Sequence, residues 1–187
     1  MSKSVLFEIY TKEKVKEINE KIKQQLAGVD TVDFIKEPET ERAQDAVKTG
    51  KFFTIPCMPL MNLLSPWLCQ CQKINREQFG YDVYWDFHIE SLNYNVYGEN
   101  GEYTWHIDSN SSSDNGVLYD SKLTCLLNLS EEPYEGGEFL TTNEAGKTKF
   151  DSGMGLIVNS LVAHRVTPVT KGERITLTYF ATGPRWK

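Results

Sequence analysis

Three histidines, His88, His106 and His164, are the side chains of this 187-residue chain best suited to bind a transition metal. His106 begins the tripeptide His106-Ile107-Asp108. In an extended segment, residues two apart point to the same side, so this imidazole and this carboxylate converge on one point. His164 follows on another predicted strand. Two imidazoles and one carboxylate suit Fe(II) and leave coordination positions open for further ligands.

Two alternatives compete with this metal site. His88-Ile89-Glu90 carries the same ligand types at the same spacing. Each histidine could also be an ordinary strand residue that hydrogen-bonds a neighbour. The spacing of the ligands by itself therefore leaves the metal site open.

Arg174, ten residues after His164, adds a second chemical feature. The period of two along a strand places Thr176, Thr178 and Phe180 on the same face as Arg174. Fe(II) with one carboxylate and two neutral imidazoles carries one net positive charge, and a bound dicarboxylate such as 2-oxoglutarate would make the site net negative. A buried cation is then needed, and arginine binds a planar carboxylate through two hydrogen bonds. The alternative is a surface position on the strand.

Composition narrows the class of protein. The chain has 26 acidic and 20 basic residues, for a net charge of −6. This balance disfavours nucleic acid and anionic membrane surfaces as partners. No apolar run reaches the roughly 18 residues of a membrane span, and the N-terminus lacks the apolar core of a secretory signal. We therefore expect a cytoplasmic globular protein.

Two helices and a series of strands are predicted to position these residues. Thr11 is expected to cap a helix whose apolar residues recur at helical spacing and which ends near Gly28. A second helix is expected over 60–79, with its main segment starting at Ser65-Pro66. Residues 37–50 read as a polar loop. Strands are expected at 51–58, 82–97, 123–129, 139–142, 155–158, 163–169 and 174–181.

This order of elements predicts a mainly β fold with supporting helices, a sandwich or barrel rather than alternating β-α-β units. The length favours one domain over residues 1–187. Helical support is expected over about 1–80 and a catalytic core over about 81–187.

Several motifs, in order, resemble the 2-oxoglutarate- and Fe(II)-dependent dioxygenases of the prolyl 4-hydroxylase-like type. They are YGENGEYTWHID at 97–108, KLT at 122–124 leading into LNLS at 127–130, YEGGEF at 134–139, NS at 159–160, HRVTPV at 164–169 and GER at 172–174. Together they cover about residues 92–184.

The resemblance implies a double-stranded β-helix, or jelly roll, flanked by the N-terminal helices. It assigns Fe(II) to His106, Asp108 and His164, and the distal carboxylate of 2-oxoglutarate to Arg174. Further cosubstrate contacts are implied for Tyr97, Thr178 and Asn128. The rival segment at 88–90 matches no ligand of the family.

The activity implied is hydroxylation of an unactivated C–H bond with O2 as oxidant and ascorbate as reductant, most simply on a prolyl residue of a peptide or protein. A free amino acid or another small molecule is the alternative substrate. A cupin-like metal-binding protein and an interaction module without iron are alternatives from other classes. The polar segment 109–119 is expected to be either a lid over the substrate or an ordinary loop.

Overall fold

The structure, a computed structural model, describes residues 4–27, 33–36, 47–85, 91–108, 119–142 and 150–186. Its helices are α1 (Lys12–Leu26) and α2 (Met61–Ile74), with a 3-10 turn η1 (Met58–Leu60) before α2 and a π-helical turn η2 (Asn75–Phe79) after it. The strands are β1 (Ser4–Glu8), β2 (Asp33–Lys36), β3 (Lys48–Pro56), β4 (Ser91–Tyr97), β5 (Glu102–His106), β6 (Tyr119–Asn128), β7 (Glu135–Gly136), β8 (Phe139–Thr141), β9 (Met154–Asn159), β10 (His164–Val166), β11 (Val169–Lys171) and β12 (Arg174–Pro184).

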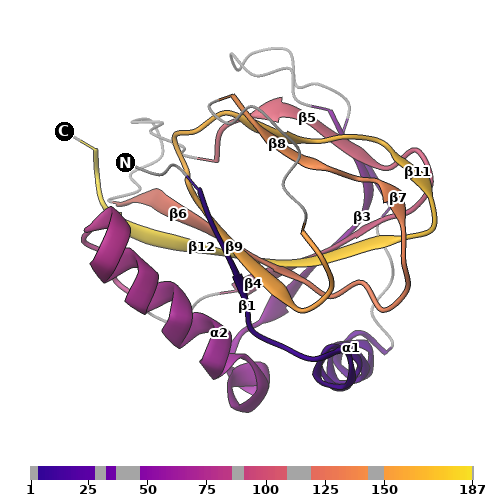
Figure 1. Cartoon of the computed structure of the whole chain (residues 1–187), viewed down its shortest axis with the longest axis horizontal. Helices are drawn as coiled ribbons and strands as arrows, with labels where there is room; N and C mark the ends of the chain where they lie inside the picture. The colour runs from indigo at the N-terminus through magenta and orange to yellow at the C-terminus, as the bar shows by residue number, and fades with distance from the viewer. Residues whose placement is uncertain are drawn as a thin grey trace.

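The main sheet is antiparallel and curls into a jelly roll, which confirms the predicted fold class (Figure 1). Its strand order is β1-β9-β6-β12-β4-β3-β5-β10-β8, with β2 paired to β3. The long strand β12 lies between β6 and β4. Directly opposite residues of neighbouring strands share a face. Arg174 therefore lies beside Tyr97, and Thr176 lies beside both Asn95 and Asn128.

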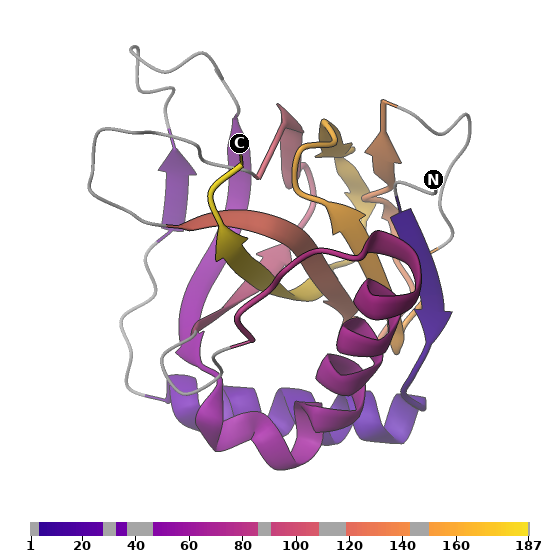
Figure 2. The same ribbon diagram turned by 90° about the vertical axis from the view of Figure 1, so that its left-hand side faces the viewer.

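The two helices cover one side of the curled sheet (Figures 1 and 2). Thr11 caps α1 as predicted, because its side chain accepts a hydrogen bond from the Lys14 backbone N–H. The buried face of α1 contains Val15, Ile18 and Ile22, which join α2 and the sheet in one hydrophobic cluster. This cluster supports the face of the sheet opposite the cavity described below.

The second helix lies within the expected range of 60–79, but the prediction that its main segment starts at Ser65-Pro66 is wrong, because α2 begins at Met61 and contains Pro66. A proline inside a helix lacks its own N–H and disturbs the neighbouring backbone bonds. The hydroxyl of Tyr10 compensates here. It donates to the Leu63 carbonyl at 2.7 Å and accepts from the Trp67 backbone N–H at 3.2 Å.

Other predicted boundaries also change. The strand expected at 51–58 begins at Lys48, inside the expected loop of 37–50, whose residues 37–46 lie outside the described part. Of the strand expected over 82–97, Ser91–Tyr97 forms β4, residues 82–85 form no strand, and residues 86–90 lie outside the described part. Strand β1 was not predicted and extends the sheet beside β9. Pairing with a distant strand, which no local pattern encodes, decides each of these boundaries.

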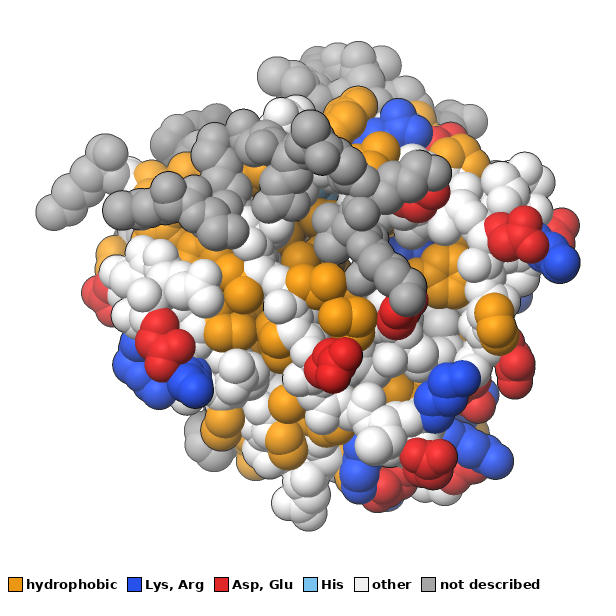
Figure 3. Space-filling model, in the orientation of Figure 1, with side chains coloured by type: hydrophobic (Ala, Val, Ile, Leu, Met, Phe, Trp, Pro, Cys, Tyr) orange, Lys and Arg blue, Asp and Glu red, His pale blue; other side chains and the backbone are white. Residues whose placement is uncertain are grey.

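In the part of the chain that the structure describes, none of the helices has the length and apolar character required to cross a bilayer. The face drawn in Figure 3 carries acidic and basic side chains next to one another.

Candidate metal and carboxylate site

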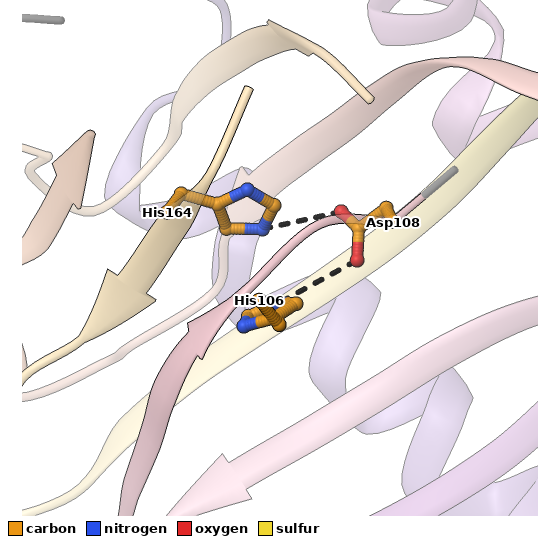
Figure 4. Close-up of side chains that lie close together, drawn as sticks. All are labelled: His106, Asp108 and His164. Atoms are coloured by element: carbon orange, nitrogen blue, oxygen red, sulfur yellow. Dashed lines mark ion pairs between the residues drawn. The ribbon is translucent and has the colours of Figure 1, made fainter. Parts of the chain in front are cut away.

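His106, Asp108 and His164 point toward one another (Figure 4). His106 ends β5, Asp108 follows it, and His164 begins β10, where it is the register partner of His106. Nε2 of His106 lies 3.4 Å from Oδ1 of Asp108, and Nε2 of His164 lies 3.2 Å from Oδ2. One ligand atom from each residue lies within 4.8 Å of the others. A single ion could therefore contact all three side chains.

Backbone carbonyls hold both imidazoles in one orientation. Nδ1 of His106 lies 2.7 Å from the Thr104 carbonyl oxygen, and Nδ1 of His164 lies 2.9 Å from that of Val162. A carbonyl only accepts, so Nδ1 carries the proton in each ring. With Nδ1 occupied in this way, Nε2 is the atom of each ring that would bind a metal ion, at the shared point beside Asp108. This arrangement is usual for histidines that bind metals.

The carboxylate of Asp108 is oriented by a threonine that sequence reasoning did not assign to the site. Thr124 Oγ1 donates to Asp108 Oδ2 at 2.6 Å and lies 3.2 Å from the hydroxyl of Ser160. Burial by itself would raise the pKa of Asp108, but hydrogen bonds and charge from His106 and His164 outweigh it and hold this pKa well below its usual range. Asp108 is therefore an anion ready to bind a cation.

Arg174 lies in the same cavity and is 1% exposed. Its Nε and Nη2 atoms are buried and have no hydrogen-bond partner among the described residues. The guanidinium carbon lies 5.4 Å from the ring centre of Tyr97 and 5.8 Å from that of Phe150. Two unpaired buried donors on one guanidinium are costly unless a ligand accepts from both. Their geometry fits a carboxylate, so the residues present fit a dicarboxylate cosubstrate as well as a metal.

A glycine makes room for this arginine. Gly137 has a φ of +61°, and a Cβ there would lie 2.8 Å from Cδ of Arg174. Its neighbour Gly136, with a φ of +72°, approaches the Pro168 carbonyl so closely that a Cβ would lie 2.2 Å from the oxygen. The two glycines of the YEGGEF motif are therefore required for different steric reasons. Gly136 allows a close approach to the Pro168 carbonyl, and Gly137 leaves space for the side chain of Arg174.

The other predicted cosubstrate residues divide into two groups. Tyr97 and Thr178 line the cavity with the metal residues and Arg174. Burial raises the pKa of Tyr97, with Arg174 opposing it, so Tyr97 remains a neutral phenol that can donate. Asn128 does not line this cavity. Its amide donates to the Phe150 carbonyl at 2.5 Å, and its oxygen accepts from the Ser130 backbone N–H.

Sequence reasoning also missed Lys48, which lines the cavity from β3. Its Nζ donates to Oδ1 of Asn95 at 3.0 Å. Asn95 donates in turn to the hydroxyl of Thr178 at 3.0 Å. The alternation Lys48, Gly50, Phe52 along an inward face could have identified Lys48, but the polar composition of 37–50 indicated a loop.

Two predictions concern residues outside the described part of the chain. The rival segment His88-Ile89-Glu90 lies there. So do residues 109–118 of the possible lid.

The comparisons with known proteins agree with this geometry. Residues 92–182 match the family model of the 2OG-Fe(II) oxygenase superfamily. A PKHD-type hydroxylase of Alteromonas mediterranea is 36% identical over 88 residues, which is 44% of this chain and 38% of that protein. A PKHD-type hydroxylase of Aliarcobacter butzleri is 33% identical over 99 residues, 47% of this chain and 41% of that protein. The matches therefore span less than half of these relatives.

Solved structures share the fold over nearly the whole chain. A viral collagen prolyl hydroxylase from Paramecium Bursaria Chlorella virus-1, in complex with 2OG, has a TM-score of 0.70 at 14% identity and covers 97% of each chain. A prolyl-4-hydroxylase from Pseudomonas putida has a TM-score of 0.65 at 16% identity, covering 99% of this chain and 93% of that one. At such identities the likeness concerns the fold.

Proposed function

Since residues 92–182 match the family model of the 2OG-Fe(II) oxygenase superfamily, we propose that this chain is a 2-oxoglutarate-dependent oxygenase, which hydroxylates an unactivated C–H bond with Fe(II), 2-oxoglutarate and O2. The observation that carries the proposal is one cavity that holds His106, Asp108 and His164 together with a buried arginine whose two nitrogens lack partners. A metal-binding protein without this cosubstrate would not need Arg174.

Each side chain has a defined task in this proposal. His106 and His164 would hold Fe(II) through Nε2 and Asp108 through its carboxylate, while Thr124 keeps that carboxylate turned to the ion. Arg174 would hold the distal carboxylate of 2-oxoglutarate, and the neutral hydroxyl of Tyr97 would donate to the same molecule. When bound, Fe(II) and 2-oxoglutarate would supply the oxidising chemistry, in which one oxygen atom of O2 enters the substrate and the other converts 2-oxoglutarate to succinate and carbon dioxide.

We propose a prolyl residue in a peptide or protein as the substrate. The support is that two proteins with this fold are named as prolyl hydroxylases, one of them as a collagen prolyl hydroxylase. We also propose that residues 1–187 form one catalytic domain, since α1 and α2 share one hydrophobic cluster with the sheet.

The test is release of succinate from 2-oxoglutarate with Fe(II), and with ascorbate as the reductant that we expect to sustain turnover. Wild-type protein should release succinate, and His106→Ala and Arg174→Met should not. Proline-containing peptides should gain the mass of one oxygen atom. Succinate release that survives Arg174→Met would refute the assigned role of this arginine, and turnover of a free metabolite without any modified peptide would refute the prolyl substrate.

A further inference from the structure

Lys48 is a cation that the site described above leaves without a counter-ion. Among the described residues that line the cavity, two carry a cationic side chain, and these are Lys48 and Arg174. An ammonium has three N–H donors, and Lys48 uses one of them on Oδ1 of Asn95. Its Nζ lies 3.8 Å from the ring centre of Phe52 and 5.1 Å from that of Tyr103. Among the described residues, no carboxylate forms an ion pair with it.

A charge count shows that the metal and 2-oxoglutarate would supply no counter-ion for Lys48. Fe(II) and Asp108 together carry one positive charge, and 2-oxoglutarate brings two negative charges. Arg174 restores neutrality, and its Nε and Nη2 atoms suit one carboxylate, while the other carboxylate of the cosubstrate would bind the metal. Lys48 then remains as one uncompensated positive charge.

The position of Lys48 is beside the metal ligands. It is the register partner of Tyr103 across β3 and β5. The ring of Tyr103 stacks on His106, with 3.4 Å between ring centres. Arg174, by contrast, enters the cavity from β12. The two cations therefore approach the cavity from different strands, and Lys48 does so on the side of His106.

We infer that Lys48 binds a carboxylate of the primary substrate and so selects substrates with an anionic group close to the carbon that is hydroxylated. This inference rests on the proposed function and adds a substrate class to it. The carboxylate could belong to an acidic residue next to a proline in a peptide or to the α-carboxyl group of a free amino acid. Both sources present the same chemistry to Lys48.

The energetics of Lys48 support a binding role. Burial lowers the pKa of Lys48 to about 8, with Asp108 opposing this change and Arg174 adding to it. Holding a cation in such a place destabilises the free protein, whereas an apolar side chain would pack against Phe52 and Tyr103 without that cost. Residues that lower stability in a cavity are characteristic of functional sites.

The first experiment separates the cosubstrate from the substrate. Calorimetry of the Mn(II)-loaded protein, which should not turn over, gives the Kd of 2-oxoglutarate for wild type, Lys48→Met and Lys48→Arg. Lys51→Met, an exposed position on the same strand, is the control. We expect less than about a 2-fold change in all three variants. A rise of about 10-fold or more in Lys48→Met alone would assign Lys48 to 2-oxoglutarate and overturn the inference.

The second experiment uses matched probes on the Mn(II)- and 2-oxoglutarate-loaded protein. L-proline is compared with L-prolinamide, and a proline peptide with an adjacent Asp is compared with its Asn counterpart. We expect the acid of at least one pair to bind about 10- to 100-fold more tightly than its amide, with the preference lost in Lys48→Met and kept in Lys48→Arg. The pair that responds identifies the source of the carboxylate.

Equal binding of acid and amide in every pair, or no binding of any acid, would overturn the inference. Failure of the proposed function would differ, because the wild-type protein would then fail to bind 2-oxoglutarate in the first experiment.

Discussion

His106 and His164 are register partners in the antiparallel pair of β5 and β10, with their ring centres 4.2 Å apart. The same pairing that closes this part of the sheet also assembles two of the three proposed metal ligands. Folding of the two strands and formation of the site are therefore a single event. Any ion held there binds the folded chain in preference to the unfolded one.

Metal binding should consequently stabilise the protein. Mn(II) at about 100 times its Kd should add about 2.7 kcal/mol to the free energy of unfolding. For a chain of this size, that corresponds to a rise of roughly 5–10 °C in Tm. Thermal unfolding followed by circular dichroism should show the rise, and a chelator should reverse it. His106→Ala should show no rise, and an undiminished rise in that variant would place the ion elsewhere.

Thr124→Val should weaken metal binding without unfolding the protein. The variant keeps the volume of the side chain and removes the hydroxyl that donates to Asp108. Loss of a partner that orients a metal ligand usually costs about 10- to 100-fold in affinity. Calorimetry with Mn(II) measures this loss, and Thr170→Val, an exposed position on β11, serves as the control. Equal affinities in the two variants would show that Thr124 does not position Asp108.

Gly137→Ala should impair the binding of 2-oxoglutarate more than that of the metal. The added methyl group would lie 2.8 Å from Cδ of Arg174, so the guanidinium must move. We expect the KM for 2-oxoglutarate to rise about 10- to 100-fold, since small displacements of positioning groups have effects of this size. Gly80→Ala is a matched control, because Gly80 has a similar φ of +69° and no atom within 4 Å of its Cβ position. A similar KM in both variants would mean that Arg174 tolerates the displacement.

Lys48→Met should raise the stability of the protein at pH 7. The pKa of Lys48 falls from 10.5 to about 8 on folding. This change corresponds to a destabilisation of the charged form by about 3 kcal/mol, and solvent screening at this partly exposed side chain reduces that cost to about 2 kcal/mol. Because the folded pKa is the lower one, the unfolded chain holds more protons between pH 8 and 10.5. The stability of the wild type should therefore rise relative to the variant across that window.

Urea unfolding at pH 7, 9 and 10.5 measures this difference. A wild type that is more stable than Lys48→Met at pH 7 would show that the ammonium is not penalised by its surroundings.

Only the pairing of His106 with Asp108 was predictable from a short-range pattern, whereas the complete set with His164 and Arg174 rested on the resemblance to a known family. The period of two along a strand predicts that His106 and Asp108 point together, and the structure brings His164 and Arg174 to the same cavity. The helix at 12–26 was predictable for a similar reason, since a cap and an apolar face are local features. The roles of His106, Asp108 and His164 as iron ligands, and of Arg174 as the cosubstrate ligand, remain our proposal.

The parts that escaped prediction depend on contacts between distant segments. Lys48 lies in a polar stretch, and only the pairing of β3 with β4 and β5 turns it into the cavity. Asn128 was expected near the cosubstrate, yet its amide is bonded to the Phe150 carbonyl and the Ser130 backbone N–H. Pro66 was expected at the start of the main helical segment because proline suits a first turn. The hydroxyl of Tyr10, which supports Pro66 within α2, comes from a remote part of the chain, so no local pattern reveals it.

The most direct measurement is a crystal structure of the protein grown without oxygen in the presence of Fe(II) and 2-oxoglutarate, with anomalous scattering recorded at the iron edge. Our account predicts one iron peak bonded to Nε2 of His106, Nε2 of His164 and the Asp108 carboxylate. It also predicts a carboxylate of 2-oxoglutarate on Nε and Nη2 of Arg174. Iron located away from these three side chains, or a cosubstrate that does not contact Arg174, would contradict it.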